Sequence, residues 1–256
     1  MTSVTLMAAK GGVGATLVAV NLAVGLAGRG RCCLVDLHLW GGDADLHLDL
    51  EPHRDWTDLL PVAGELTEHH LELALTVHGS GLGLLAAPAA PRTALDIRSA
   101  DGLLSALSTR FEWLIIDGPA GSDPLLPDVL RRSDMAILVT TADPPALRGA
   151  ARVRAMVPYP LQSRLGLVVN QMTRSHPASP SVLAESLEAR LLAVLPRDPQ
   201  YVGYQVNYGQ PAVLSPGSSL GREIVSLVRR LESWQATPSP HATDGRLTYL
   251  DSDQPL

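Results

Sequence analysis

The chain repeats one pattern along its length, a short apolar run followed by a longer helical stretch. The runs are apolar throughout, which is typical of strands with both faces covered in a parallel sheet. Strands alternating with helices predict an α/β fold of three layers, a mostly parallel, twisted sheet with helices on both faces. We predict strands at Ser3–Ala8, Cys32–Asp36, Leu82–Leu85, Trp113–Asp117, Met135–Thr140, Leu165–Asn170 and Leu192–Leu195. We predict helices at Thr16–Ala27, Ala100–Ser108, Pro145–Met156, Ser181–Leu191 and Ser219–Trp234.

A glycine loop joins the first predicted strand to the first predicted helix. Residues Lys10–Thr16 include Gly11, Gly12 and Gly14. Glycines let the backbone turn and approach a phosphate closely. The free N–H groups at the helix start then point at the anion, whose charge the helix dipole favours. Thr16 stands where a phosphate-loop hydroxyl binds Mg²⁺, so the loop predicts a nucleotide site.

A Rossmann dinucleotide site is the alternative for this loop. Gly12, Gly14 and the acidic Asp36 about twenty residues later fit it superficially. Leu17, however, stands where the third glycine belongs, and Lys10 has no role in such a site. Lys10 is the single lysine among twenty basic residues, which hints that this position needs a compact point charge. These observations favour ATP over NAD.

The loop resembles the deviant Walker A motif of the MinD/ParA ATPases, and the resemblance covers most of residues 3–234. It implies that ATP or ADP binds with Mg²⁺, and that Lys10 reaches the partner subunit's nucleotide in an ATP-sandwich homodimer. It gives Lys10 and Asp36 catalytic roles. The metal would be held by Thr16, Asp36 and Asp117. The nucleotide would contact Lys10, Gly11, Gly12, Val13, Gly14, Ala15, Thr16, Leu17, Asn170, Pro196 and Asp198, the last three near the base.

A narrower resemblance, to the CpaE/TadZ branch of Flp/Tad pilus assembly factors, is carried by Gly11–Ala23, Val35–Pro52, Ser80–Pro88 and Asn207–Pro211. It implies a nucleotide-dependent dimeric localisation factor with pilus or secretion assembly proteins as partners. The resemblance also implies a cytoplasmic protein that partners recruit to the inner face of the membrane or to a cell pole. A MinD-like septum-site regulator, a ParA-like partitioning protein and a pseudo-ATPase scaffold are the alternatives.

Two residues depart from the family pattern. Ala15 replaces the ordinary phosphate-loop lysine, and His38 replaces the second switch aspartate, which orients the attacking water. Positioning and charge stabilisation supply almost all of phosphoryl-transfer catalysis. We therefore expect nucleotide binding with weak or absent hydrolysis. His38 as a weak base and His38 without a role are both open.

Charge and cysteine usage exclude some other classes. The formal net charge of −6 and the scattered arginines argue against a nucleic-acid binder. Cys32 and Cys33 are neighbours on one predicted strand, so they point to opposite faces as buried thiols. No basic residue precedes the first apolar run, and Gly11–Gly28 is too rich in glycine for a membrane span, so neither a signal peptide nor an integral membrane segment is expected.

Three features leave their structure or role open. Polar and apolar residues alternate over Asp43–Leu50, which favours a strand with a solvated face over a metal site. Trp40 is a core anchor or a partner contact. His69, His70 and His78 are expected on the surface.

We divide the chain into a P-loop domain over 1–234 and a disordered polar tail over 235–256, rich in Pro, Ser, Thr and Asp.

Overall fold

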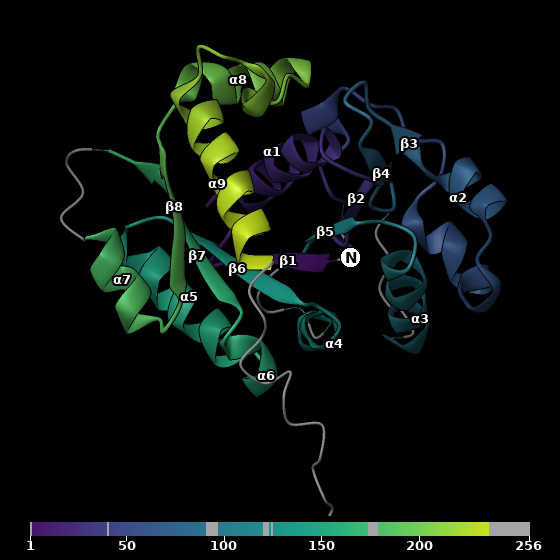
Figure 1. Ribbon diagram of the computed structural model, residues 1–256, viewed down its shortest axis with the longest axis horizontal. Helices are drawn as coiled ribbons and strands as arrows, with labels where there is room; N and C mark the ends of the chain where they lie inside the picture. The colour runs from purple at the N-terminus through teal and green to yellow at the C-terminus, as the bar shows by residue number, and fades with distance from the viewer. Residues whose placement is uncertain are drawn as a thin grey trace, which may run out of the picture.

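The computed structural model describes residues 2–39, 41–90, 97–119, 123, 125–173 and 179–235, with only the backbone of 97–100. Within these residues the sheet has eight strands in the order β3-β4-β2-β5-β1-β6-β7-β8 (Figure 1). All neighbours pair in parallel except β3, which runs antiparallel to β4. The strands are β1 (Thr2–Ala8), β2 (Cys32–Asp36), β3 (Thr76–Val77), β4 (Gly83–Leu85), β5 (Trp113–Asp117), β6 (Met135–Thr140), β7 (Leu165–Met172) and β8 (Arg190–Pro196).

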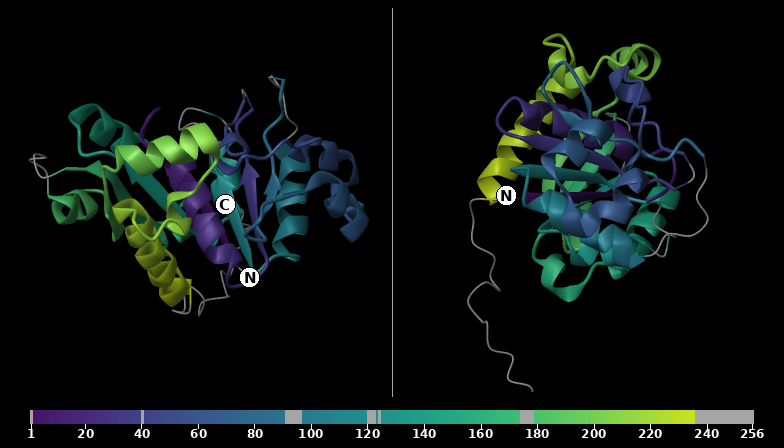
Figure 2. Two further views of the ribbon diagram at one scale, coloured as in Figure 1. Left: turned by 90° about the horizontal axis from the view of Figure 1, so that it is seen from above. Right: turned by 90° about the vertical axis from the view of Figure 1, so that its right-hand side faces the viewer.

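Helices cover both faces of this sheet. The crossover from β1 to β2 runs toward one edge of the sheet. The crossover from β4 to β5, and those that lead from β5 to β8, run toward the other edge. Because such crossovers are right-handed, the helices of the two sets lie on opposite faces of the sheet. Figure 2 shows α1 and α9 together on one face. The helices are α1 (Ala15–Ala27), α2 (Glu68–Ala74), α3 (Ile97–Ser108), α4 (Leu126–Arg131), α5 (Pro144–Ala155), α6 (Tyr159–Gln162), α7 (Pro180–Ser186), α8 (Pro199–Tyr208) and α9 (Ser219–Gln235). Three 3₁₀ segments, η1 (Leu46–Leu48), η2 (Trp56–Glu65) and η3 (Ala212–Leu214), complete the described elements.

The core confirms the prediction for the two cysteines. Cys32 packs in the apolar cluster that contains α1, and Cys33 in the cluster on the other face that contains Trp56 and Leu103. Both thiols are buried and free, and burial raises both of their pKa values. Neighbouring residues of a strand thus seal the two helical layers separately.

The predicted α/β fold is confirmed, but two local predictions are wrong. The helix expected over Ser181–Leu191 ends at Ser186, because Glu188 adopts a left-handed φ of 49°, and β8 begins at Arg190. Asp43–Leu50 is not a strand. Local hydrogen bonds wind it instead into η1, with His47 N–H donating to the Asp43 carbonyl at 3.1 Å and Leu48 N–H to the Asp45 carbonyl at 3.0 Å.

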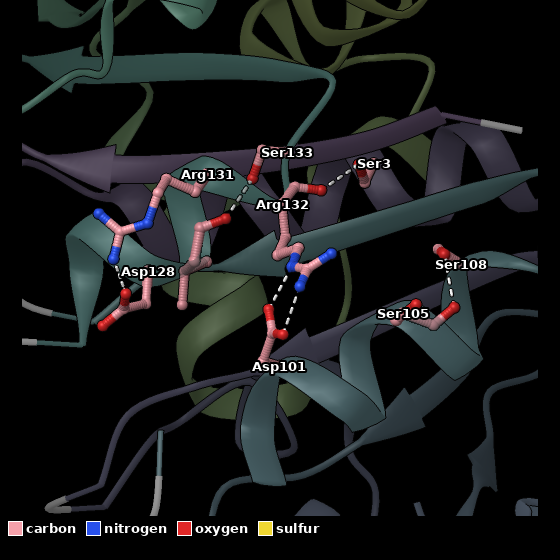
Figure 3. A network of polar contacts seen from close by, with 9 residues as sticks. Ser3, Asp101, Ser105, Ser108, Asp128, Arg131, Arg132 and Ser133 are labelled. Carbon is pink, nitrogen blue, oxygen red and sulfur yellow. Dashed lines mark hydrogen bonds and ion pairs between the residues drawn. The ribbon is translucent and has the colours of Figure 1, made fainter. Parts of the chain in front are cut away.

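A polar network holds the amino-terminal edge of the sheet (Figure 3). The Arg132 guanidinium pairs with Asp101 of α3, and the Ser3 hydroxyl donates to the Arg132 carbonyl at 3.2 Å. The Ser133 hydroxyl donates to the Val129 carbonyl at 2.9 Å. These contacts tie α3 and α4 to the start of β1, at the edge away from the glycine loop.

A buried amide pair joins α1 to α8. The Asn21 amide donates to Gln205 Oε1 at 2.6 Å and to the Leu17 carbonyl at 2.8 Å, while its oxygen accepts from Val213 N–H at 2.9 Å. Both Asn21 and Gln205 are fully buried. The helix that follows the glycine loop is therefore fixed to α8 and η3 through one side chain.

We predict that Asn21→Ala lowers the free energy of unfolding by about 2–4 kcal/mol, because Val213 N–H loses its buried acceptor and Gln205 Oε1 loses its closest donor. Urea denaturation followed by circular dichroism measures this change. Asn207→Ala is the matched control, since the Asn207 amide is exposed and donates to the carbonyl of Gly203, one turn earlier in α8. Equal losses in the two variants would contradict the role given to Asn21.

Candidate functional site

The polar residues singled out above gather at the carboxyl edge of the sheet. The glycine loop follows β1, Asp36 ends β2, Asp117 ends β5, and Asn170 lies near the end of β7. The register of β2 against β5 places Asp36 directly beside Asp117. Ligands of open α/β sheets bind outside this edge.

The glycine loop adopts a backbone that favours glycine. Gly12 and Gly14 have φ values of 80° and 87°, in the left-handed region. A Cβ at Gly14 would lie 2.6 Å from the Asn170 amide nitrogen. Gly14 is the N-cap of α1 and offers no side-chain cap, so the first N–H groups of α1 remain for an anion.

Two amides of β7 hold the loop from behind. The Asn170 amide donates to the Val13 carbonyl at 2.8 Å, and the Gln171 amide donates to the Gly12 carbonyl at 3.0 Å. Asn170 Oδ1 accepts the Gln171 N–H at 2.8 Å, and Gln171 takes a left-handed φ of 56°. Asn170, predicted near the base, therefore supports the phosphate loop here. Gln171 was not predicted, since no motif marks it.

A cavity of about 1030 Å³ extends from the loop to α8. Ligand pockets have volumes of about 300–1,000 Å³, so the space suits a nucleotide. All predicted nucleotide contacts line it: Lys10, Gly11, Gly12, Val13, Gly14, Ala15, Thr16, Leu17, Asn170, Pro196 and Asp198. Two cations that the sequence analysis did not select, Arg152 and Arg197, also line it.

Asp198 anchors a helix as well as lining the cavity. Its Oδ2 accepts from the hydroxyls of Ser218 and Ser219, at 3.1 and 3.0 Å, and from the Leu220 N–H at 3.2 Å. Burial opposes ionisation, but these hydrogen bonds outweigh it and lower the pKa of Asp198. The carboxylate that was predicted near the base thus holds the start of α9.

The predicted metal ligands meet below the loop. Asp117 is fully buried, and neither of its carboxylate oxygens accepts a hydrogen bond from the described residues. Burial and the Asp36 charge raise the pKa of Asp117, while the neighbouring His38 and Thr16 side chains lower it. Asp36 Oδ1 accepts from His38 N–H at 3.1 Å, and its Oδ2 accepts from Ala44 N–H at 3.2 Å.

His38 lies over both carboxylates. Its Nδ1 is 2.7 Å from Asp36 Oδ1 and 3.6 Å from Asp117 Oδ2. Burial alone would lower the pKa of His38, but the hydrogen bond to Asp36 and the charges of Asp117, Asp36 and Asp43 raise it to about 9. The imidazole is therefore a cation at neutral pH and neutralises part of this acidic group.

Other candidate residues lie apart from this group. Lys10 is exposed, and its charge is one of the smaller contributions that lower the pKa of Asp143, after the hydrogen bond from Thr141. The Asp43–Leu50 segment brings no metal cluster of its own, and His47 instead lines the cavity with a buried Nδ1. His69 is exposed, whereas His70 and His78 are half-buried. Trp40 and the tail beyond Gln235 lie outside the described residues.

No helix in the described ranges is both long and apolar enough to span a bilayer.

Known proteins resemble this chain in sequence and in architecture. The ParA family, described as NUBPL iron-transfer P-loop NTPase, matches residues 1–231. The septum site-determining protein MinD of Synechocystis is 30% identical over 233 residues, which cover 87% of this chain and 86% of that protein. The Pyrococcus furiosus cell division ATPase MinD has a TM-score of 0.77 and 27% identity, covering 91% of this chain and 99% of its own. A ParA family ATPase from Chlorobium tepidum has a TM-score of 0.80 at 21% identity, covering 90% and 98%, which supports the fold. The chain belongs to the MinD/ParA family of P-loop NTPases.

Proposed function

We propose that this chain binds ATP with Mg²⁺ and acts as a nucleotide-dependent positional regulator of the MinD kind. The observation that carries the proposal is the glycine loop, with its uncapped helix start, opening into a cavity that the predicted base-binding residues also line. The loop N–H groups favour a polyphosphate. The cations Lys10, Arg152 and Arg197 add positive charge around the same cavity.

The acidic group below the loop fits Mg²⁺. Asp117 is a buried carboxylate that receives only a long contact from His38 and no close hydrogen bond from the described residues, and buried charges need a close partner or a metal ion. Thr16 would bind the ion through its hydroxyl, and Asp36 and Asp117 would hold it, Asp117 through water. The ion would neutralise part of the triphosphate charge.

Hydrolysis would be slow because of Ala15 and His38. Ala15, at the start of α1, supplies no charge to the phosphates. His38 donates toward Asp36, so its ring does not replace the carboxylate that orients water in the family. Lys10 and Asp36 keep their proposed catalytic roles. A vestigial site in a pseudo-ATPase scaffold is the outcome if no nucleotide binds.

The relatives favour a division role over a pilus role. MinD of Synechocystis is named for determining the septum site. The CpaE/TadZ reading rests on the motifs alone and is the second candidate. Cells lacking the gene distinguish the two, because the division role predicts misplaced septa with surface pili retained, and the pilus role predicts the reverse.

Iron transfer, which the family description mentions, does not fit the cysteines of this chain. Cys32 and Cys33 are the two cysteines of the sequence, and both are buried on opposite faces of β2. Iron–sulfur clusters need several thiolates directed at one point.

We predict that the chain binds ATP and ADP in the presence of Mg²⁺ and gives almost no heat with NADH. Isothermal titration calorimetry measures this. Gly14→Val is the informative variant, because a side chain at φ 87° is strained and meets the Asn170 amide, so ATP heat should disappear. Gly64→Val is the control, since a Cβ there contacts nothing. Equal affinity for ATP and NADH would contradict a phosphate-loop site.

We predict that Ala15→Lys combined with His38→Asp raises the rate of ATP hydrolysis by at least about 10²–10³, because it restores a charged stabiliser and the water-orienting carboxylate. A phosphate-release assay measures the rates. Ala15→Met combined with His38→Asn adds similar bulk without charge and should stay slow. Rapid turnover by the unmodified chain would show that the two departures are harmless.

We predict a homodimer that forms only with ATP and depends on Lys10. Two triphosphates facing each other repel unless cations lie between them, and Lys10 is an exposed cation of the loop. Lys10→Ala should abolish ATP-induced dimerisation in light scattering while monomer ATP affinity is mostly retained. Arg148→Ala, an exposed cation of α5, is the control. Loss of ATP binding by the Lys10→Ala monomer would place the lysine on its own nucleotide instead.

A further inference from the structure

We propose that Asp36, His38 and Asp117 form a binding site for a divalent transition-metal ion such as Co²⁺ or Zn²⁺, and that this ion binds without nucleotide. This proposal differs from the Mg²⁺ role above, because it uses the imidazole as a ligand and requires no phosphate. It therefore stands or falls independently of ATP binding.

The three side chains already lie at the spacing of a metal site. One ligand atom from each lies within 4.8 Å of the others. His38 Nδ1 lies 2.7 Å from Asp36 Oδ1 and 3.6 Å from Asp117 Oδ2. Ligand atoms about 2.0–2.2 Å from a tetrahedral ion are about 3.3–3.6 Å apart, so the contact with Asp117 already fits an ion, and the hydrogen-bonded contact with Asp36 must open by roughly 0.6–0.9 Å.

Asp117 is the independent sign that a ligand belongs here. Its side chain is fully buried, and the neighbouring His38 and Thr16 side chains make no close hydrogen bond to either carboxylate oxygen. An ionised carboxylate in this position carries a large desolvation cost unless a cation approaches it. The His38 ring lies within 4 Å of Asp117 and offers only a long contact, whereas a metal ion would bond directly.

The mixed ligand set selects the class of ion. Carboxylates and water alone suit Mg²⁺, Ca²⁺ and Mn²⁺, whereas an imidazole ligand suits Zn²⁺, Co²⁺, Ni²⁺ and Cu²⁺. Asp43 and Asp45 lie near enough to interact electrostatically with Asp36 or His38, and their negative charge favours any divalent ion. His38 also lines the large cavity, so an ion has a way in.

A purely structural role for the cluster is the competing explanation. In that case protonated His38 pairs with the two carboxylates, and no metal displaces its proton. The two explanations differ in whether a stoichiometric ion binds, and in whether His38 supplies a nitrogen ligand.

The first experiment titrates tag-free, chelator-treated, full-length protein with Co²⁺ in the absence of nucleotide. Visible absorption should show one Co²⁺ ion per chain, and calorimetry should give the affinity. Loss of a residue that only supports a ligand costs about 10–100-fold in metal affinity. Because His38 would be a ligand itself, His38→Ala should weaken Co²⁺ binding by more than this. His69→Ala is the matched control, since this exposed histidine lies near Glu72 on the surface, and it should leave the affinity unchanged.

The second experiment identifies the ligand and guards against misfolding. His38→Asp replaces the nitrogen ligand with an oxygen ligand, so it should lose Co²⁺ preference and gain affinity for Mn²⁺ or Mg²⁺. In the Cu²⁺ complex, nitrogen coupling in the electron paramagnetic resonance spectrum should be present in the unmodified chain and absent from His38→Asp. No stoichiometric Co²⁺ binding, or binding that His38→Asp leaves unchanged, would overturn the proposal whether or not ATP binds.

Discussion

Two carboxylates that lie side by side at the ends of adjacent strands are the constraint on which the site depends. The parallel register of β2 and β5 pairs Asp36 with Asp117, and both are buried. Like charges at this separation in a dry environment disfavour each other's ionisation. The surroundings compensate locally, because the Ala44 N–H and the His38 side chain both approach Asp36. The turn after β2 is therefore shaped by the need to neutralise a strand end.

The sequence analysis found the sheet and the loop because both are encoded locally. Continuous apolar runs identify strands that are covered on two faces, and β1, β2, β5 and β6 lie within a residue of the predicted bounds. The glycines of the loop are needed for backbone angles that other residues rarely adopt. The side-by-side placement of Asp36 and Asp117 could not be predicted in this way, because apolar runs do not encode the order of strands in a sheet.

The errors and omissions arise where distant contacts decide the structure. The alternation over Asp43–Leu50 favours a strand, but none of the strands in the described residues pairs with it, and the Asp36 carboxylate and local turns fix it instead. Gln171 supports the loop by donating to the carbonyl of Gly12, which lies 159 residues earlier in the chain. Asp198 holds the start of α9 by accepting hydrogen bonds from Ser218 and Ser219. These serines follow it by 20 and 21 residues, after α8 and η3, so no local sequence pattern connects them to it.

The hydrogen bonds from β7 to the glycine loop have a consequence for the rate at which a ligand binds. Hydrogen bonds from Asn170 and Gln171 fix the carbonyls of Val13 and Gly12 through groups of the protein alone. A loop that is already ordered loses little conformational entropy when a phosphate enters it. Association at this end of the cavity is then governed by diffusion and electrostatic attraction rather than by a slow rearrangement of the loop, so differences in affinity between ligands should appear in how quickly they leave.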